Sequence, residues 1–281
     1  MKQARVDSIV RCPKCNRGFL VTAGGRSTPA RCRQCGASYP IQRGVIELVP
    51  DTGRSGSLMQ RAMEAETVVS IYESRGWRRS VLASLAFGIS FEQERDLILR
   101  GAAVKRRDVV LDLACGTGIY TRPLAALARS GVVVGLDRSL PMLRLASVLC
   151  RKDKLHNVIL IHGTAGRLPF APEHFDLVHC GSALHLFPQA APVLREVHRV
   201  LKPGGCFTAS TVRWEGGAKI ADYTRALLGI HPFSTGEIDA RCRRAGFTQI
   251  SFHHASRLWL IMSARKPEEV VGRRSSVAGR R

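Results

Sequence analysis

The sequence has few acidic residues and no long run of apolar ones. Asp and Glu number 22 against 43 Lys and Arg in 281 residues, which gives a formal net charge of +21. No apolar run approaches the ~20 residues that a membrane-spanning helix needs, and no charged-then-apolar signal segment precedes Cys12. We therefore expect a soluble chain with no membrane span that is not exported.

The sequence also lacks the cysteine pattern of a disulfide framework. Nine cysteines is an odd number, and five of them are scattered singly along the chain. This usage fits a reducing cytoplasm better than an oxidising compartment. We therefore predict a cytoplasmic protein.

The other four cysteines form two CxxC pairs within residues 1–50. Sixteen residues separate the pair Cys12 and Cys15 from the pair Cys32 and Cys35, a spacing typical of structural zinc sites. Four thiolates fill a tetrahedral shell around Zn²⁺ and leave no open position for chemistry, so a redox role is the less favoured alternative. We predict a separate zinc ribbon over residues 1–50, with short strands at 39–41 and 44–48.

The positive charge is concentrated towards the two ends of the chain. Residues 1–50 and 265–281 together hold 11 of the 21 net charges. This pattern favours attraction to a polyanion such as nucleic acid. A GC-rich genome would give a similar excess, since 35 of the 43 basic residues are Arg, so charge alone does not identify the substrate.

One stretch, VVLDLACGTG at 109–118, indicates a nucleoside-binding turn. It predicts a buried parallel strand that reaches Asp112 and then breaks at Gly116 and Gly118, before a helix over 119–130. A second strand, 132–136, ends at Asp137, which lies 19 residues after Gly118. That spacing is typical of an acid that binds ribose hydroxyls.

The pattern lacks the third small residue of a pyrophosphate-binding turn, because Thr121 occupies that position. NAD and FAD are therefore poor candidates. Further strands are predicted at 158–162, 175–180 and 206–212, with helices at 141–150, 191–201 and 234–245. This alternation predicts a doubly wound α/β sheet that binds a nucleoside at its carboxyl edge.

Four motifs follow one another in a familiar order: LDLACGTG, GLDRSLPMLRLA, GRLPFAPEHFDLVHC and APVLREVHRVLKPGG. Together they resemble the class I S-adenosylmethionine (SAM)-dependent methyltransferases over residues 109–266. The resemblance implies a seven-stranded Rossmann-like domain at 108–264, in which 247–252 and 258–263 form an antiparallel hairpin. It implies SAM as the cofactor, bound by Asp112, Ala114, Gly116, Gly118, Asp137, Arg138, Thr164, Ala165 and Cys180.

Two details of this resemblance concern the adenine pocket. Thr164 stands where the family usually has an Asp that accepts from the adenine amino group. The hydroxyl can still accept a hydrogen bond, but it carries no charge. The stretch 167–170 matches the one that lines the adenine pocket in the family.

The flanking regions carry weaker resemblances. The stretch CGASYPIQRGVIELVP resembles the Trm112-like zinc ribbons, which serve recognition or partner contact. Residues 51–107 are predicted to form a linker, indicated by the composition of 50–57, and a helical cap. The stretch 58–107 resembles a segment of ribbon-bearing plastid and bacterial methyltransferases that would cover the cleft, with Tyr72 and Trp77 either packing the cap, which is the favoured alternative, or contacting the cofactor or substrate. The Arg/Ser/Gly-rich composition from Arg265 onwards predicts a disordered basic tail.

The resemblance to the methyltransferases that act on quinones and polyketides implies in-line methyl transfer to a small aromatic or apolar metabolite. His185, in the loop after the fourth strand, is the candidate general base, although it could instead only order the loop. His179 is predicted to lie inside the strand. Two alternatives stay open: methylation of a ribosomal-RNA base, with the ribbon binding RNA, and a cofactor-binding scaffold without turnover.

Overall fold

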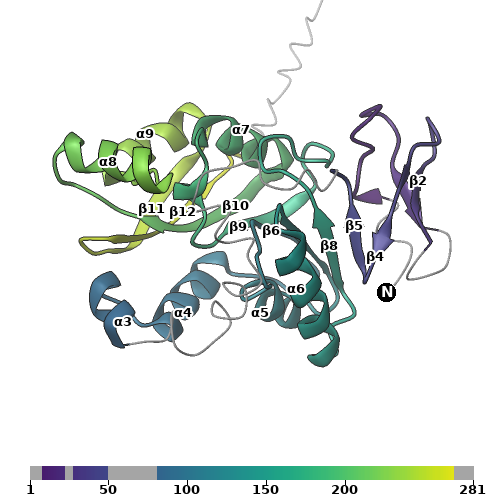
Figure 1. Cartoon of the computed structure of the whole chain (residues 1–281), viewed down its shortest axis with the longest axis horizontal. Coiled ribbons are helices and arrows are strands. Elements are labelled where there is room, and N and C mark those ends of the chain that lie inside the picture. Colours follow the sequence, from purple (N-terminus) through teal and green to yellow (C-terminus); the bar gives the residue numbers. More distant parts are fainter. Residues whose placement is uncertain (1–7, 23–27, 50–80, 269–281) are drawn as a thin grey trace, which may run out of the picture.

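The computed structural model describes residues 8–22, 28–49 and 81–268, and its centre is a twisted nine-stranded sheet (Figure 1). The strand order is β11-β12-β10-β9-β6-β7-β8-β5-β4. In chain order these strands are β4 (Ile41–Gln42), β5 (Val45–Glu47), β6 (Val109–Leu113), β7 (Val132–Asp137), β8 (Val158–His162), β9 (Phe175–Cys180), β10 (Leu201–Val212), β11 (Thr248–Ala255) and β12 (Trp259–Arg265).

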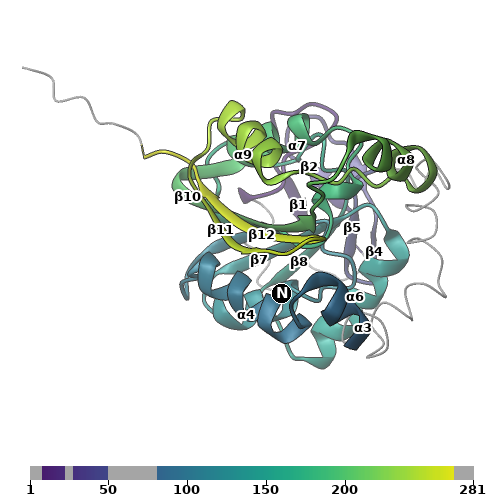
Figure 2. The ribbon, with the colours of Figure 1, turned by 90° about the vertical axis from the view of Figure 1, so that its left-hand side faces the viewer.

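Helices cover both faces of the sheet, and a hydrophobic cluster lies on each side (Figure 2). One layer holds α3 (Val81–Phe87), α4 (Phe91–Ala102), α5 (Thr121–Leu127) and α6 (Leu140–Lys152). The other holds α7 (Ala190–Val200), α8 (Ala218–Leu228) and α9 (Thr235–Arg244), with a 3-10 turn, η2 (Leu184–Leu186), before α7. None of the helices in the described ranges is long and apolar enough to cross a bilayer.

The predicted methyltransferase-type sheet is confirmed. Strands β6, β7, β8 and β9 are parallel, and their apolar residues are buried on both faces. Helices α5 and α6 connect β6 to β7 and β7 to β8, whereas a loop connects β8 to β9. The last two strands form the expected antiparallel hairpin. One boundary differs from the prediction, because β10 begins at Leu201 and not at Cys206. The pairing of β10 with β9 is irregular between these two residues, where Gly204 has a φ of +73°.

The N-terminal segment is divided differently from the prediction. Strands β1 (Leu20–Thr22), β2 (Ala30–Cys32) and β3 (Ser38–Tyr39) form a small antiparallel sheet with the cysteine pairs. Strands β4 and β5, predicted as part of the ribbon, instead extend the main sheet, with β5 parallel to β8. All five residues of β8 are buried, so β5 covers an apolar edge that would otherwise expose unpaired backbone groups.

The ribbon also shares its core with the central domain. Val10 forms a β-bridge with Phe170, and the backbone N–H of Arg11 donates to the carbonyl of Pro169 at 2.8 Å. Both Leu168 and Phe170 are buried in the same cluster as Val10. The stretch 167–170 therefore holds the ribbon, and none of its residues lines the cavity described below. Its place in the adenine pocket stays a prediction.

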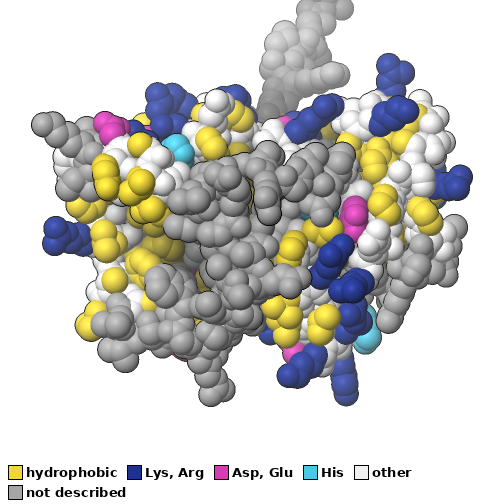
Figure 3. All heavy atoms as spheres, viewed as in Figure 1, with side chains coloured by type: hydrophobic (Ala, Val, Ile, Leu, Met, Phe, Trp, Pro, Cys, Tyr) yellow, Lys and Arg dark blue, Asp and Glu magenta, His cyan; other side chains and the backbone are white. Residues whose placement is uncertain are grey.

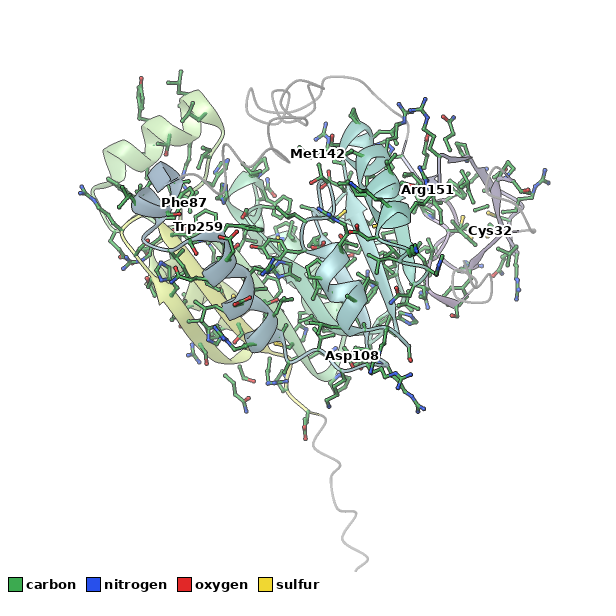
Figure 4. The ribbon with its side chains drawn as sticks, turned by 90° about the horizontal axis from the view of Figure 1, so that it is seen from below. Cys32, Phe87, Asp108, Met142, Arg151 and Trp259 are labelled. Carbon is green, nitrogen blue, oxygen red and sulfur yellow. The ribbon has the colours of Figure 1, made fainter. Side chains whose placement is uncertain are left out.

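The described part of the predicted cap forms a layer of the domain and does not line the cleft. Helix α4 packs against β10 and β12, and its N-terminus carries a full capping box between Ser90 and Gln93. Phe87, at the end of α3, packs against Trp259 with the two rings tilted and their centroids 4.6 Å apart (Figure 4). Tyr72 and Trp77 lie outside the described residues.

The chain stays ordered beyond the predicted start of the tail. Arg265 is the last residue of β12, where it pairs with Cys206. The ammonium of Lys266 lies 3.1 Å from a carboxylate oxygen of Glu173 and donates to the carbonyl of Leu201. The boundary at 265 is therefore wrong, and residues 269–281 lie outside the described part.

Candidate functional site

A cavity of about 440 Å³ opens at the carboxyl ends of the central strands. This is the edge at which doubly wound sheets bind ligands. Seven of the nine predicted cofactor-binding residues line it: Asp112, Ala114, Gly116, Asp137, Arg138, Thr164 and Ala165. The sheet therefore brings together side chains that are separated by up to 53 positions in sequence.

The turn after β6 is built from left-handed backbone. Ala114, Gly116 and Gly118 have φ values of +58°, +54° and +80°. The non-glycine Ala114 in this region costs on the order of 1 kcal/mol, and such strain is common at ligand sites. Gly118 does not line the cavity; it shapes the turn through a hydrogen bond from its N–H to the Cys115 carbonyl.

Asp137 is held rigidly at the end of β7. Its Oδ2 accepts from the backbone N–H of Gly116 and its Oδ1 from that of Ser139, both at 2.7 Å. Ser139 is in turn the N-cap of α6. Burial raises the pKa of Asp137, although these N–H donors act in the opposite direction. Each oxygen keeps a lone pair for a further donor, which is what two ribose hydroxyls require.

Asp112 lies beside it at the end of β6 and is almost completely buried. The hydroxyl of Thr121, at the start of α5, donates to its Oδ2. Burial, with the nearby charge of Asp137 adding to it, raises the pKa of Asp112 to about 7. The site therefore holds a proton near neutral pH that a bound cation would displace.

Cys180 does not line the cavity, and its contact with the cofactor stays a prediction. The residue is fully buried in the hydrophobic cluster between the sheet and α7. Burial raises the pKa of its thiol well above the ordinary value. The family motif correctly places Cys180 at the end of β9. Side chains alternate between the two faces of a strand, and that of Cys180 lies on the face that packs into the core.

The structure also fails to bring the side chain of His185 into the cavity. His185 lies in η2, where its neighbour Leu186 lines the cavity and it does not. The backbone N–H of Val212 donates to its Nδ1 at 3.2 Å, and the Thr211 hydroxyl lies 3.3 Å from the same atom. These contacts orient the ring against β10. The role of His185 as a general base stays a prediction.

Sequence reasoning missed most of the apolar lining. It comes from the two residues before α5, from the segment between β9 and α7, and from the first turn of α7. These residues are Ile119, Tyr120, Leu186, Phe187, Pro188, Pro192 and Val193. The run LHLFP at 184–188 was the local sequence signal for this lining. Apolar side chains in a loop indicate that the loop packs against another surface or a ligand.

Residues 110–205 match the family model of a methyltransferase domain. This segment includes the glycine turn, Asp137, the segment after β9 and helix α7, which are parts that form the cavity. The chain contains an S-adenosylmethionine-dependent methyltransferase domain.

Curated relatives extend this similarity over different lengths. An uncharacterised chloroplastic methyltransferase of Arabidopsis thaliana is 25% identical over 92% of this chain and 79% of its own length. A demethylmenaquinone methyltransferase of Geobacillus stearothermophilus is 42% identical, over 42% of this chain. The chain spans about half the length of that enzyme.

A solved structure gives the same fold. Phosphoethanolamine N-methyltransferase 2 of Haemonchus contortus, solved with S-adenosyl-L-methionine, superposes with a TM-score of 0.63. The match covers 78% of this chain and 62% of that chain at 17% identity, so it establishes the fold of the methyltransferase domain.

The raised pKa of Asp112 predicts how the stability of the methyltransferase domain depends on pH. The folded chain binds this proton more tightly than the unfolded chain, whose pKa is near 3.8. The free energy of unfolding should therefore fall as pH rises from about 4 to 7, by up to about 1.4 kcal/mol per pH unit from this group. In Asp112→Asn that part of the decline should be absent, which urea unfolding at pH 5, 6, 7 and 8 without ligand would measure. Parallel pH profiles for the two proteins would contradict the assignment.

Outside the methyltransferase domain, the four cysteines of the CxxC pairs lie close together. All four Sγ atoms are within 4.8 Å of one another. Cys12 and Cys35 are 3.7 Å apart, and Cys15 and Cys32 are 3.6 Å apart. Four sulfurs bound at 2.3 Å around a tetrahedral zinc would be separated by about 3.8 Å, so the donor set and its spacing suit this metal.

The backbone around the cluster supports thiolate ligands. The N–H groups of Gln34 and Cys35 point to the Sγ of Cys32 at 3.3 and 3.5 Å. A Cβ placed on Gly18 would lie 2.6 Å from that same sulfur, so only glycine fits there. Figure 4 shows Cys32 in the ribbon, on the far side of α6 and Arg151 from Trp259.

Proposed function

We propose that the chain transfers the methyl group of SAM to a small, mainly apolar and aromatic metabolite. The observation that carries this proposal is the lining of the cavity. Beyond the two acids and Arg138, the side chains contributed by the residues before α5, the segment after β9 and the start of α7 are mostly apolar. A volume of about 440 Å³ is in the range of small-molecule sites.

The alternative of an RNA acceptor has less support at this site. A nucleic-acid substrate needs cations around the cleft for its phosphates, and Arg138 is the sole Lys or Arg among the described residues of the lining. Lys and Arg instead lie scattered over the face drawn in Figure 3, with few Asp or Glu between them. We therefore keep RNA methylation as an outcome of the test.

In the proposed reaction, the chain's residues bind and orient. SAM supplies a methyl group that is already activated on a sulfonium. Asp137 would accept the ribose hydroxyls, the turn at Gly116 lets the backbone approach, and Asp112 would balance the positive charge of the ligand. Holding an acceptor in line with the methyl group and excluding water can supply about 7–11 kcal/mol of the barrier.

We further propose that Cys12, Cys15, Cys32 and Cys35 bind a structural Zn²⁺. Four thiolates complete its coordination, so the metal would contribute folding free energy and no chemistry. Because β5 continues the ribbon into the main sheet, the metal would stabilise the β8 edge of the methyltransferase domain. Gly163, the first residue after β8, lines the cavity.

The acceptor class can be tested with SAM radiolabelled on its methyl group. The purified chain should transfer label to small hydroxylated aromatics in an organic-soluble extract and leave total RNA unlabelled. Asp137→Ala, which should not bind the donor, is the blank. Label in RNA would support the alternative acceptor, and S-adenosylhomocysteine (SAH) binding without label in either pool would support the scaffold without turnover.

A further inference from the structure

A second cavity, of about 540 Å³, opens at the amino ends of the central strands. Its lining includes Val132 and Val158, the first residues of β7 and β8, so it lies at the opposite edge of the sheet from the cavity described above. Asp108, which immediately precedes β6, marks this edge in Figure 4, and Met142 of the first cavity lies at the other end of the domain. The proposed methyl transfer uses no residue of this second cavity.

The lining of the second cavity contains basic side chains and no acidic one. Arg129, Lys154 and His156 are exposed to solvent, and no Asp or Glu is present among the described lining residues. The guanidinium of Arg106, from the loop before β6, is held at the rim, because its Nε donates to the hydroxyl of the lining residue Ser130 at 2.9 Å. Four basic side chains from three separate segments of the chain therefore meet around one cavity.

The fold does not neutralise the charge of this group. Within the described part of the chain, Arg106, Arg129 and Lys154 form no ion pair with an acidic side chain. Asp153, next to Lys154 in sequence, instead lies 3.4 Å from the guanidinium of Arg122. Positive charges that are held together without a counter-ion repel one another, so a bound anion would stabilise them.

The ends of α5 and α6 do not account for these basic side chains. Both helices end at this edge, where cations can compensate the free carbonyls of a helix C-terminus. Here the side-chain amide of Asn157 donates to the carbonyls of Ala125 and Ala128 at 3.0 and 2.8 Å. At the end of α6, the backbone N–H groups of residues 153–155 donate to the carbonyls of residues 149–151. Capping of the two helices therefore does not require the basic side chains.

The chemistry of the lining indicates what an occupant would contain. Guanidinium and ammonium groups bind phosphate oxygens, and a guanidinium does so through a planar pair of N–H donors. The rest of the lining is mostly apolar and includes Ala125, Val132 and Leu155. A volume of about 540 Å³ is in the range of small-molecule sites. A phosphate carried on a compact, partly apolar body, as in a nucleotide, suits both parts of the lining.

We propose that this amino-edge cavity is a second binding site, which takes a phosphate group of a nucleotide. Arg129 and Lys154 bind the phosphate oxygens, Arg106 and His156 add donors at the rim, and the apolar lining contacts the nucleoside. The site is separate from the methyl-transfer cavity, because the two share no lining residue. A free nucleotide and a nucleic-acid strand present the same phosphate chemistry to it.

The experiment measures ligand binding by calorimetry on the full chain in excess SAH, which keeps the first cavity occupied. The probes are uridine diphosphate (UDP) and uridine, which share a nucleoside and differ in the phosphates. The wild type should bind UDP more tightly than uridine by about tenfold or more, because charge-assisted hydrogen bonds are the stronger ones. Arg129→Gln combined with Lys154→Gln should weaken UDP binding by about tenfold or more, since each removed cation takes such a contact with it.

Arg225→Gln combined with Arg243→Gln is the matched control. Both arginines are exposed and lie on α8 and α9, in the other helical layer, so the control removes the same net charge away from the cavity. UDP affinity and melting temperature should stay close to the wild type, with the affinity within about twofold. An oligouridylate of about ten nucleotides distinguishes the two sources of phosphate. Tighter binding than UDP with a steeper salt dependence indicates a strand, and binding no tighter than UDP indicates a free nucleotide.

Three results would overturn the second site. They are equal affinity of the wild type for UDP and uridine, unchanged UDP affinity in the variant of Arg129 and Lys154, and equal weakening in the control. The last of these would show that net charge alone attracts the ligand. Absence of SAH binding in the wild type would instead overturn the proposed function and leave the UDP result standing, so the two failures are distinguishable.

Discussion

Asp137→Ala should lose SAH binding by about 100-fold or more. The substitution removes a charged acceptor for two ribose hydroxyls, and hydrogen bonds to charged groups contribute roughly 1.5–3 kcal/mol each. It also releases the N–H groups of Gly116 and Ser139, which the carboxylate holds at 2.7 Å. Since each 1.4 kcal/mol is a tenfold change in affinity, two such contacts account for the expected loss. Calorimetric titration with SAH measures it.

Asp108→Ala is the matched control for this variant. Asp108 immediately precedes β6, at the opposite end of the strand from the cavity, and its carboxylate accepts from the backbone N–H of Lys105 (Figure 4). This change removes one carboxylate and the same number of atoms, yet SAH affinity should remain within about twofold. Wild-type affinity in Asp137→Ala would show that the cavity binds the donor in another way.

Cys12→Ser combined with Cys15→Ser should remove the zinc and lower the melting temperature by roughly 10 °C. Loss of a structural metal costs several kcal/mol of folding free energy, and 1 kcal/mol corresponds to about 2–4 °C in a domain of this size. SAH affinity should also fall, because β5 supports β8 next to Gly163. Zinc content, thermal unfolding and SAH titration measure the three effects.

Two glycine substitutions provide a control that leaves every thiol in place. Gly18→Ala puts a methyl group 2.6 Å from the Sγ of Cys32 and should reduce zinc content. Gly236→Ala adds the same methyl group where nothing lies within 4 Å, and should leave zinc content and stability unchanged. A double cysteine variant that melts like the wild type would rule out the structural metal.

The sequence alone determined the central sheet and the polar half of the site. Runs of buried β-branched residues predicted the strands β6 to β9, and amphipathic segments predicted helices between them. Both predictions depend only on the local spacing of apolar residues. The glycine turn and Asp137 were predictable for the same reason, since they lie at the ends of two neighbouring strands. The order of motifs then identified the methyltransferase domain.

Only the tertiary structure decided which side chains face the cavity. His185 and Leu186 are adjacent in one short turn, and the contacts of β10 with the imidazole leave Leu186 to line the cavity. The same is true of β4 and β5, whose few residues could extend either the ribbon or the main sheet. The exposed apolar edge of β8 decided between them, because unpaired strand edges are satisfied by pairing between segments that are distant in sequence.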